Sequence, residues 1–338
     1  MREATIRDVA REAGVSISTV SKVLNQKGRV GTQTIEHVRK VAEQLNYTPN
    51  SIAVSMVVKK SNLIAVMVPD IITDFYAQVI QGVEEAAREI GLSTIIVNTD
   101  ARRENEYGLL YGRIGKLVDG VVAIPSVNDR QIYAAFDKPI VFVDRLVDDA
   151  GIDSIVIDNY NGAYAATRYL IGKGHRRIGF ISAGLDINVG KERYLGYAQA
   201  LRDFKIAENR DYVYFGDWHE ATGQRAVEHF SALKQPPTAL FAANCNICIG
   251  VLKYCSGHAV KIGADYSLIG FDDHLLAHYA SPKVTVVSRP TIEMGHQAVA
   301  MLENRMTPQG RRESRKKIVL PVKLVERDSV SAVSDESK

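Results

Sequence analysis

The sequence has little cysteine: three residues in 338, all between Cys245 and Cys255. Three cysteines in one short segment cannot all be paired in disulfide bonds within the chain. We therefore expect a cytoplasmic protein in a reducing compartment. The sequence also has no uncharged apolar run of about 18 residues, the length of a membrane-spanning helix, and its first residues lack the apolar core of a secretory signal. We therefore expect a soluble protein without a membrane anchor.

Motifs that carry catalysis or hold a cofactor are also missing. The sequence contains no P-loop, no HExxH, no GxSxG and no glycine pattern for dinucleotides. We therefore expect no enzyme activity, no cofactor and no metal. Cys245, Cys248 and Cys255 could form a metal or redox site, but three buried thiols in a helix are the simpler interpretation.

What the sequence does have is a globular composition with an uneven charge. Of its residues 46% are hydrophobic and 24% are charged, and a length of 338 suggests two or three domains. Residues 1–60 contain ten Lys and Arg against five Asp and Glu, so this head carries +5 when the whole chain carries +3. A small basic head favours a polyanion partner such as DNA, although basic segments are often only solvated surface.

The basic head has the spacing of three short helices. Apolar residues recur every three or four positions in residues 5–13, 17–24 and 32–45, so each segment can bury one face. Gly14 can take the left-handed conformation of a tight turn after the first segment, and Ser16 can cap the second. This order predicts a helix-turn-helix domain whose second helix lies in the major groove of DNA.

The second predicted helix has a small, mostly polar outward face. It consists of Ile17, Ser18, Ser21 and Lys22. Residues at the N-terminal end of such a helix would meet base edges. The alternative is a generic three-helix bundle that packs elsewhere in the protein, but the turn sequence and the basic charge favour DNA binding.

Longer motifs of the head occur in a specific order. They are Thr5-Ile6-Arg7-Asp8-Val9-Ala10, Ala13-Gly14-Val15-Ser16, Thr19-Val20-Ser21-Lys22-Val23-Leu24-Asn25 and Leu45-Asn46-Tyr47-Thr48-Pro49-Asn50. This set resembles the head of the lactose/galactose-repressor family of bacterial transcription regulators. The resemblance implies that bases are read by Ile17, Ser18 and Lys22. It also implies that other residues contact the DNA, chiefly its phosphates: Thr5, Ser16, Thr19, Ser21, Asn25 and Arg29.

Residues 49–60 are too short to form a stable helix alone. The family resemblance implies that this hinge segment becomes a helix on operator DNA, pairs with its copy across a dimer and inserts an apolar residue into the minor groove. Met56 stands where the family has leucine, and the neighbouring Ala53-Val54-Ser55 lacks the family's basic residue. We therefore expect weaker or differently tuned operator bending. A plain linker without a DNA role is the alternative.

The body, from residue 62 on, alternates apolar runs with amphipathic helical segments such as 75–90. The runs are 63–68, 94–97, 121–124, 140–143, 178–181, 213–215, 239–242 and 267–270. Continuous apolar runs separated by helices predict parallel strands covered on both faces, here in two doubly wound α/β lobes. Ligands of such sheets bind at the carboxyl ends of the strands, so we expect a binding cleft between the lobes.

Motifs in the body resemble the type I periplasmic sugar-binding fold as far as about residue 328. They include Val143-Asp144-Arg145, Gly174-His175-Arg176-Arg177-Ile178-Gly179, Ala243-Asn244 and Gly270-Phe271-Asp272-Asp273. The resemblance implies a helix-turn-helix domain at 1–48, the hinge at 49–60 and an effector-binding and dimerisation domain at 61–328. In that domain one lobe holds 62–158 and 289–320, and the other holds 159–288. Residues 329–338 are expected to form a flexible tail.

Several polar residues directly follow predicted strands and could meet a ligand in the cleft. The candidate effector-binding residues are Asp144, Arg193, Asn244 and Asp272, with the aromatic Phe75, Tyr76 and Trp218 offering faces to a sugar ring. Each could instead be ordinary strand-end polarity or core packing, and Asp144 could orient Arg193. Cys245 stands where the family commonly has aspartate, so the ligand of a relative cannot be transferred to this chain.

These patterns together predict a repressor that binds a near-palindromic operator as a homodimer and is switched by a small, sugar-like effector in the cleft. The chain has no leucine heptads for a tetramer. One alternative is a regulator whose corepressor is a phosphorylated carrier protein. Another is a sugar-binding transport component, against which the basic head and the absence of a signal sequence count.

Overall fold

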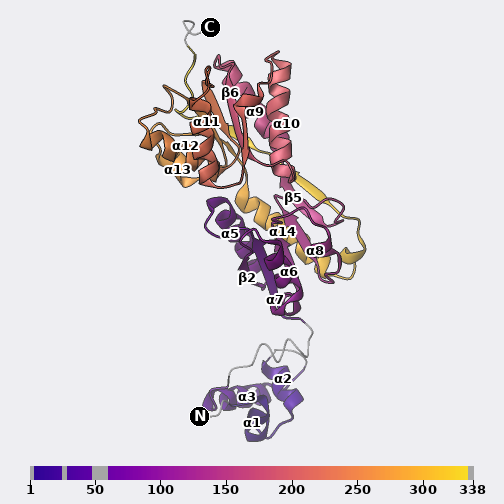
Figure 1. Cartoon of the computed structure of the whole chain (residues 1–338). Helices are drawn as coiled ribbons and strands as arrows, with labels where there is room; N and C mark the ends of the chain where they lie inside the picture. Colours follow the sequence, from indigo (N-terminus) through magenta and orange to yellow (C-terminus); the bar gives the residue numbers. More distant parts are fainter. Residues whose placement is uncertain (1–3, 25–28, 48–59, 334–338) are drawn as a thin grey trace. The chain divides into compact units, whose positions relative to one another are not determined.

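The computed structural model describes residues 4–24, 29–47 and 60–333. They belong to two compact units, Met1–Ser61 and Asn62–Lys338. Figure 1 shows three helices in the first unit and two α/β lobes in the second. This architecture confirms the predicted fold class.

The head folds as the three predicted helices, α1 (Ile6–Glu12), α2 (Ile17–Leu24) and α3 (Thr32–Gln44). A capping box starts α1, because the backbone NH of Asp8 donates to Thr5 Oγ1 and the Asp8 carboxylate accepts from the backbone NH of Thr5. Gly14 takes the left-handed conformation with φ +63° in the turn before α2. The helices then share one core, to which they contribute the fully buried Val9, Val20 and Val38.

The first lobe contains a six-stranded sheet in the order β11-β5-β4-β3-β1-β2, in which all neighbours are parallel. Its strands are β1 (Leu63–Val68), β2 (Ser93–Asn98), β3 (Gly120–Ala123), β4 (Ile140–Val143), β5 (Asp153–Ile157) and β11 (Lys317–Leu320). Its helices are α5 (Asp74–Glu89), α6 (Arg103–Tyr111), α7 (Arg113–Leu117), α8 (Gln131–Ala134) and α14 (Thr291–Met306), followed by the short η2 (Gly310–Arg312).

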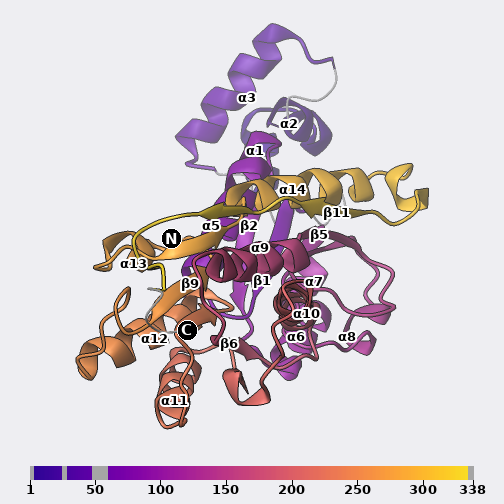
Figure 2. The same ribbon diagram turned by 90° about the horizontal axis from the view of Figure 1, so that it is seen from above.

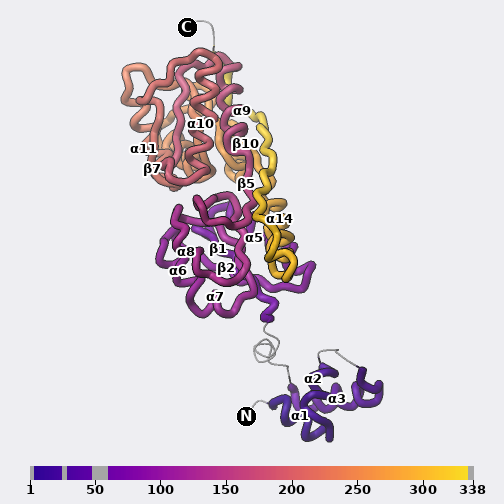
Figure 3. The backbone as a smooth tube through the Cα atoms, turned by 90° about the vertical axis from the view of Figure 1, so that its right-hand side faces the viewer, coloured from indigo at the N-terminus to yellow at the C-terminus, as the bar shows by residue number. Residues whose placement is uncertain are grey.

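Side chains of β1 alternate between two hydrophobic cores. Ile64, Val66 and Val68 pack with α5 and α14, whereas Ala65 and Met67 pack with α6 and α8. Figure 3 shows these two groups of helices on opposite sides of the sheet, and Figure 2 shows α5 and α14 side by side. A strand buried on both faces needs a continuous apolar sequence, which is why this pattern predicted it.

The second lobe repeats this topology. Its sheet has the order β12-β10-β9-β8-β6-β7, and only the pairing of β12 with β10 is antiparallel. The strands are β6 (Ile178–Ala183), β7 (Val213–Gly216), β8 (Ala239–Ala242), β9 (Ser267–Phe271), β10 (Thr285–Ser288) and β12 (Lys323–Val325). The helices are α9 (Asn159–Gly172), α10 (Asn188–Asp203), η1 (Arg210–Tyr212), α11 (Glu220–Ser231), α12 (Cys245–Gly257) and α13 (Leu275–Tyr279).

The chain passes between the lobes three times. The crossings lie between β5 and α9, between β10 and α14, and between β11 and β12 (Figure 3). Each sheet therefore receives an edge strand from the C-terminal part of the chain.

The expectation of a flexible tail from residue 329 is wrong for residues 329–333. Ser329 is fully buried, and its Oγ donates to the Leu268 carbonyl at 2.6 Å and accepts from the Thr285 NH at 2.8 Å. The backbone NH of Val333 donates to the Lys173 carbonyl at 2.9 Å. Polar residues lie here because their hydrogen bonds satisfy strand ends of the second lobe. Residues 334–338 are outside the described residues.

Among the described residues, no helix has the length and apolar composition that crossing a bilayer requires.

Candidate functional site

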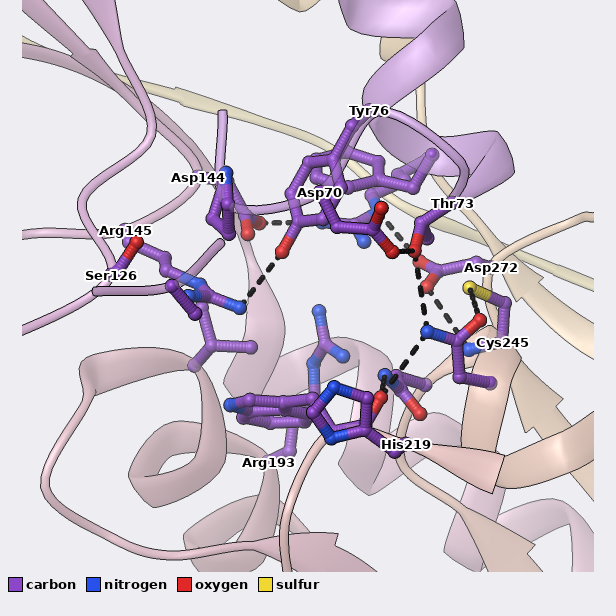
Figure 4. Close-up of a pocket in the computed structure, with 18 of the residues that line it drawn as sticks. Asp70, Thr73, Tyr76, Ser126, Asp144, Arg145, Arg193, His219, Cys245 and Asp272 are labelled. Carbon is purple, nitrogen blue, oxygen red and sulfur yellow. Dashed lines mark hydrogen bonds and ion pairs between the residues drawn. The ribbon is translucent and has the colours of Figure 1, made fainter. Parts of the chain in front are cut away.

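A cavity of about 360 Å³ lies between the two lobes, at the carboxyl ends of their strands (Figure 4). Pro69, Asp144 and Asp272 line it, and each directly follows a strand, namely β1, β4 and β9. The structure brings all seven candidate effector-binding residues to this cavity: Phe75, Tyr76, Asp144, Arg193, Trp218, Asn244 and Asp272. Their role in binding a ligand stays a prediction.

Asp144 and Asp272 occupy equivalent positions in the two lobes. Both take a left-handed backbone conformation, with φ of 66° and 80°. The backbone NH of Asp144 donates to the Ile155 carbonyl at 2.8 Å, and that of Asp272 donates to the Val287 carbonyl at 2.9 Å. A non-glycine residue in this conformation costs about 1 kcal/mol or more, so the neighbouring strand must hold it in place. The two carboxylates are thereby aimed into the space between the lobes.

Arg289 joins these two aspartates, and the sequence analysis missed it. It follows β10 at the second crossing, with its Nη1 2.5 Å from Asp144 Oδ1 and its Nε 2.6 Å from Asp272 Oδ1. The second contact is an ion pair without the geometry of a hydrogen bond. The guanidinium also lies 3.4 Å above the ring of Phe75, so one face of that ring is not free for a sugar. One arginine thus links the two lobes at the back of the cavity.

The ion pairs shift the proton affinities of their members. Burial opposes ionisation of Asp272, but the charges of Arg289 and Arg193 outweigh it and leave the pKa of Asp272 below its usual range. Burial likewise lowers the pKa of Arg289, but Asp272 and Asp144 outweigh it, so that its pKa is raised. Asp272 and Arg289 are therefore both charged at neutral pH.

Arg193 lies on the second lobe side of the cavity and is only 1% exposed. Its Nε donates to Asn159 Oδ1 at 2.9 Å, its Nη1 donates to the Ala243 carbonyl, and its guanidinium lies 3.5 Å above the ring of Phe271. Burial, together with the charge of Arg289, lowers the pKa of Arg193 to about 10. Neutral oxygens therefore position Arg193 directly, whereas Asp144 accepts a hydrogen bond from Arg289.

The opposite wall is built around Tyr76 and Arg145. Arg145 Nη2 donates to the Tyr76 hydroxyl at 2.8 Å, and the Arg145 guanidinium is 5.9 Å from the ring centroid of Trp218, across the cavity. At the mouth, Asn246 Nδ2 donates to Thr73 Oγ1 at 3.3 Å, so a direct hydrogen bond also joins the two lobes. The two lobes are therefore already in direct contact around the cavity in this conformation.

Asn244 does more for the fold than its position after β8 suggested. Its Oδ1 caps α12 by accepting from the Ile247 NH at 2.8 Å, and its Nδ2 donates to the Trp218 carbonyl at 3.3 Å. Both polar atoms are engaged within the protein. Its contribution to the cavity is therefore to position Trp218 and α12.

The three cysteines are buried thiols. Burial raises the pKa of Cys245 well above its ordinary value, that of Cys248 to about 12 and that of Cys255 to about 11. Thiols with raised pKa values are poor nucleophiles and poor metal ligands. In the described part of the chain, no group of three or more His, Cys, Asp or Glu residues is placed to hold a metal ion.

The head presents the outward face that the sequence predicted for α2. Ser16, Ile17, Ser18 and Lys22 are exposed, with Ile17 at 47%, whereas Val20 and Val23 point into the core. Ser16 Oγ accepts from the backbone NH of Thr19 at 3.1 Å and so caps the helix. Thr19 and Ser21 are half-buried and Arg29 is exposed. Asn25 and Met56 are outside the described residues, so their predicted DNA contacts stay predictions.

Known proteins match both units of the chain. Residues 5–50 match the bacterial regulatory proteins of the lacI family, and residues 167–330 match a periplasmic binding protein-like domain. The HTH-type transcriptional regulator RegA of Clostridium saccharobutylicum is 32% identical, over 96% of this chain and 98% of that protein.

Two solved structures are similar over nearly the whole chain. The Lac repressor dimer bound to operator and the anti-inducer ONPF has a TM-score of 0.84 and 26% identity, and covers 98% of this chain and 100% of that one. The complex of the transcriptional regulator CelR with cellobiose has a TM-score of 0.72 and 28% identity, over 96% and 99%. Since head, body and full-length relatives agree, the chain belongs to the lacI family and is a DNA-binding transcriptional regulator.

Proposed function

We propose that this regulator is a cytoplasmic repressor that binds a near-palindromic operator as a homodimer and is switched by a small polar effector between its lobes. The observation that carries the proposal is the cavity whose walls come from both lobes, with Tyr76 and Asp144 on one side and Arg193 and Asp272 on the other. A ligand that touches both walls binds the closed arrangement better than an open one. It therefore shifts the population of lobe conformations, and with it the DNA affinity.

The switched state must be transmitted to two heads, which requires a dimer interface that senses both lobes. Large apolar side chains are exposed on each lobe: Ile71 at 49% and Ile72 at 88% before α5, and Leu275 at 63%, Leu276 at 49% and Tyr279 at 76% on α13. Ile72, Leu275 and Leu276 line one groove. Contiguous exposed apolar surface marks an interaction site. We assign this surface to a second copy of the chain, which the dimer in the similar Lac repressor structure supports.

The DNA-binding part of the proposal assigns base reading to Ile17, Ser18 and Lys22 on α2. Their exposure on one face of that helix supports it. Two copies of α2 related by a dimer axis would read two half-sites, which is why the operator is proposed to be near-palindromic.

The experiment measures operator affinity with and without an effector found by a thermal-shift screen of sugars and sugar acids. Arg193→Ala and Asp272→Ala should abolish the effector's influence while operator affinity without effector stays within a few-fold. Removing Arg193 leaves a ligand group unpaired in a dry site, which costs about 1–3 kcal/mol. Removing Asp272 frees Arg289 from one of the two carboxylates that hold it between the lobes.

Asp272→Asn serves as a second variant, because it keeps the shape of the side chain beside Arg289. Lys191→Ala is the control, since Lys191 is exposed on the same helix as Arg193 and does not line the cavity. An unchanged effector response in all three cavity variants would move the regulatory site out of the cleft and favour a protein corepressor.

A further inference from the structure

The buried wall of the cavity carries one positive charge more than it carries negative charges. Its buried charged residues are Arg145, Arg193 and Arg289 against Asp144 and Asp272. Arg289 engages both carboxylates through the ion pairs described above. These carboxylates are the groups that could best accept hydrogen bonds from sugar hydroxyls, and they are already taken.

The other two arginines have no carboxylate partner among the described residues. Arg193 donates only to the Asn159 side-chain oxygen and the Ala243 carbonyl, and its Nη2 is buried without a hydrogen-bond partner. Arg145 donates only to the Pro125 carbonyl and the Tyr76 hydroxyl, and its Nε is likewise unpartnered. Two buried guanidinium groups thus lack a counter-charge, and each retains an unused donor. Figure 4 shows Arg145 and Arg193 on different walls of the same cavity.

We propose that the effector is a monoanionic sugar acid whose carboxylate docks between Arg193 and Arg145. This inference rests on the proposed function, because it names the ligand class of the same cleft. A buried cation without a counter-charge is costly, so a ligand that supplies a carboxylate gains more than one that supplies a hydroxyl. Arg289 sets this preference, since it engages both aspartates and leaves Arg145 and Arg193 for the ligand.

The size and the mouth of the cavity fit one sugar unit that enters with its carboxylate first. A volume of about 360 Å³ is near the lower end of the roughly 300–1,000 Å³ range of small-molecule pockets. Of the other acids of the lining, Asp70 is half-buried and Asp100 is exposed. These acids place negative charge at the outside of the cavity, whereas the buried arginines place positive charge inside it. The excess of one buried positive charge matches a carboxylate better than a dianionic phosphate.

The test compares matched neutral and acidic ligands by isothermal titration calorimetry on the full chain. The acids are D-gluconate, D-glucuronate and D-galacturonate, the neutral parents are D-glucose and D-galactose, and D-glucose 6-phosphate and inorganic phosphate report on phosphate chemistry. At least one acid should bind about tenfold or more tightly than its neutral parent, as expected for a charge-assisted hydrogen bond.

Variants assign that preference to the arginines. Arg193→Gln should bring the acid and its parent to similar affinity, Arg193→Lys should retain part of the preference because it keeps the charge, and the surface control Lys191→Gln should change neither affinity. If Arg193→Gln does not fold, as judged by its melting temperature without ligand, Arg145→Gln tests the same charge from the first lobe.

The inference is overturned if a neutral parent binds as tightly as its acid, if no acid binds, or if a phosphate binds more tightly than every carboxylate. Operator affinity, measured in parallel, separates this inference from the proposed function. If a neutral sugar changes operator affinity through Arg193, the proposed function is supported and the sugar-acid inference is rejected. If an acid binds through Arg193 without changing operator affinity, the sugar-acid inference is supported and the proposed function is rejected.

Discussion

Arg289 pairs with two buried carboxylates in the cavity. It offsets the mutual repulsion of Asp144 and Asp272, which are aimed at the same space from equivalent positions of the two lobes. Breaking a buried ion pair by removing one partner costs far more than the pair contributes, because it leaves an uncompensated buried charge. The arginine is therefore a structural requirement for the closed cavity as well as a determinant of its charge.

Arg289→Gln should lower the free energy of unfolding by about 3–5 kcal/mol at pH 7. The two carboxylates would then lose the cation that bridges them, which raises their pKa values, so the loss should shrink as the pH falls toward 5 and they take up protons. In the unaltered chain the pKa of Asp272 is lowered, so its contribution to stability is complete at neutral pH. That contribution is lost only as the pH falls below about 4, the value of an unfolded aspartate.

Urea denaturation of both chains between pH 4.5 and 8 measures this difference. Arg103→Gln is the control, because Arg103 pairs with Asp129 at 2.7 Å but at the surface, and it should change stability little. A destabilisation by Arg289→Gln that is the same at every pH would contradict the role given to the two carboxylates.

Lys22 is the basic residue on the exposed face of α2. Lys22→Ala should weaken binding to an operator selected in vitro by about 1–3 kcal/mol and relax the preference at one symmetric base pair, because a lysine can donate to guanine O6 and N7. Fluorescence anisotropy with the operator and its single-base variants measures both effects.

Lys40→Ala is the matched control, since Lys40 is exposed on α3 outside the predicted contacts. An equal loss of affinity on all sequences would make Lys22 a phosphate contact instead of a base contact.

At the scale of elements, glycines set how closely the helices pack. A Cβ on Gly250 of α12 would lie 1.9 Å from the Glu220 carbonyl oxygen at the start of α11, and one on Gly223 of α11 would lie 2.2 Å from the Ile247 carbonyl oxygen. Each helix thus presents a glycine to the backbone of the other. The position of α12 matters for the cavity, because its first residue, Cys245, lines it.

Gly250→Ala should destabilise the chain by about 1–3 kcal/mol or more, since the clash is with backbone that cannot turn away. Gly257→Ala, at the end of the same helix, meets nothing within 4 Å and should be neutral or stabilise by about 0.5–1 kcal/mol. Urea midpoints with unchanged slopes measure the pair. Similar effects of the two substitutions would show that helix propensity, and not close packing, determines the change in stability caused by Gly250→Ala.

The elements that the sequence predicted are those with continuous apolar sequence. All eight predicted strands are present, whereas β5, β10, β11 and β12 were not assigned. β5 begins with Asp153, whose buried carboxylate pairs with Arg305 of α14, so a polar residue interrupts the pattern of a fully buried strand. β11 and β12 are edge strands with half-exposed side chains. Tertiary pairing therefore decides where local sequence is ambiguous.

The same reason explains what the sequence could and could not predict of the site. Asp144 and Asp272 follow strongly apolar strands, so the rule that ligands bind at strand ends found them. Arg289 follows β10, in which Thr285 and Ser288 interrupt the apolar pattern. The strand was therefore not predicted, and the same rule could not be applied to Arg289. Which carboxylate pairs with which arginine depends on contacts across 145 positions of sequence, and residue types alone do not encode them.

At the scale of the whole molecule, the exposed apolar surface beside the cavity predicts how copies of the chain associate. Leu276→Asp should raise the dissociation constant of the proposed dimer by about tenfold or more, because it places a charge in the groove shared with Ile72 and Leu275. Sedimentation velocity over a concentration series measures this, and cooperative operator binding should weaken in parallel.

Leu195→Asp is the control on the same lobe, since Leu195 is 40% exposed on α10 and does not line the groove. A dimer that withstands Leu276→Asp and dissociates with Leu195→Asp would place the interface on the opposite face.

The three crossings between the lobes also determine the order in which the chain can fold as it leaves the ribosome. The first sheet is incomplete until β11 is synthesised. Helix α14, which packs against α5, begins only at Thr291. The second sheet is likewise incomplete until β12 is synthesised, and the hydrogen bonds at its strand ends need Ser329. Domains usually fold one after another during translation, N-terminal first. Here the head can fold early, but the two lobes must be completed almost together, because β11, β12 and Ser329 follow one another within a few seconds of synthesis at about 5–20 residues per second.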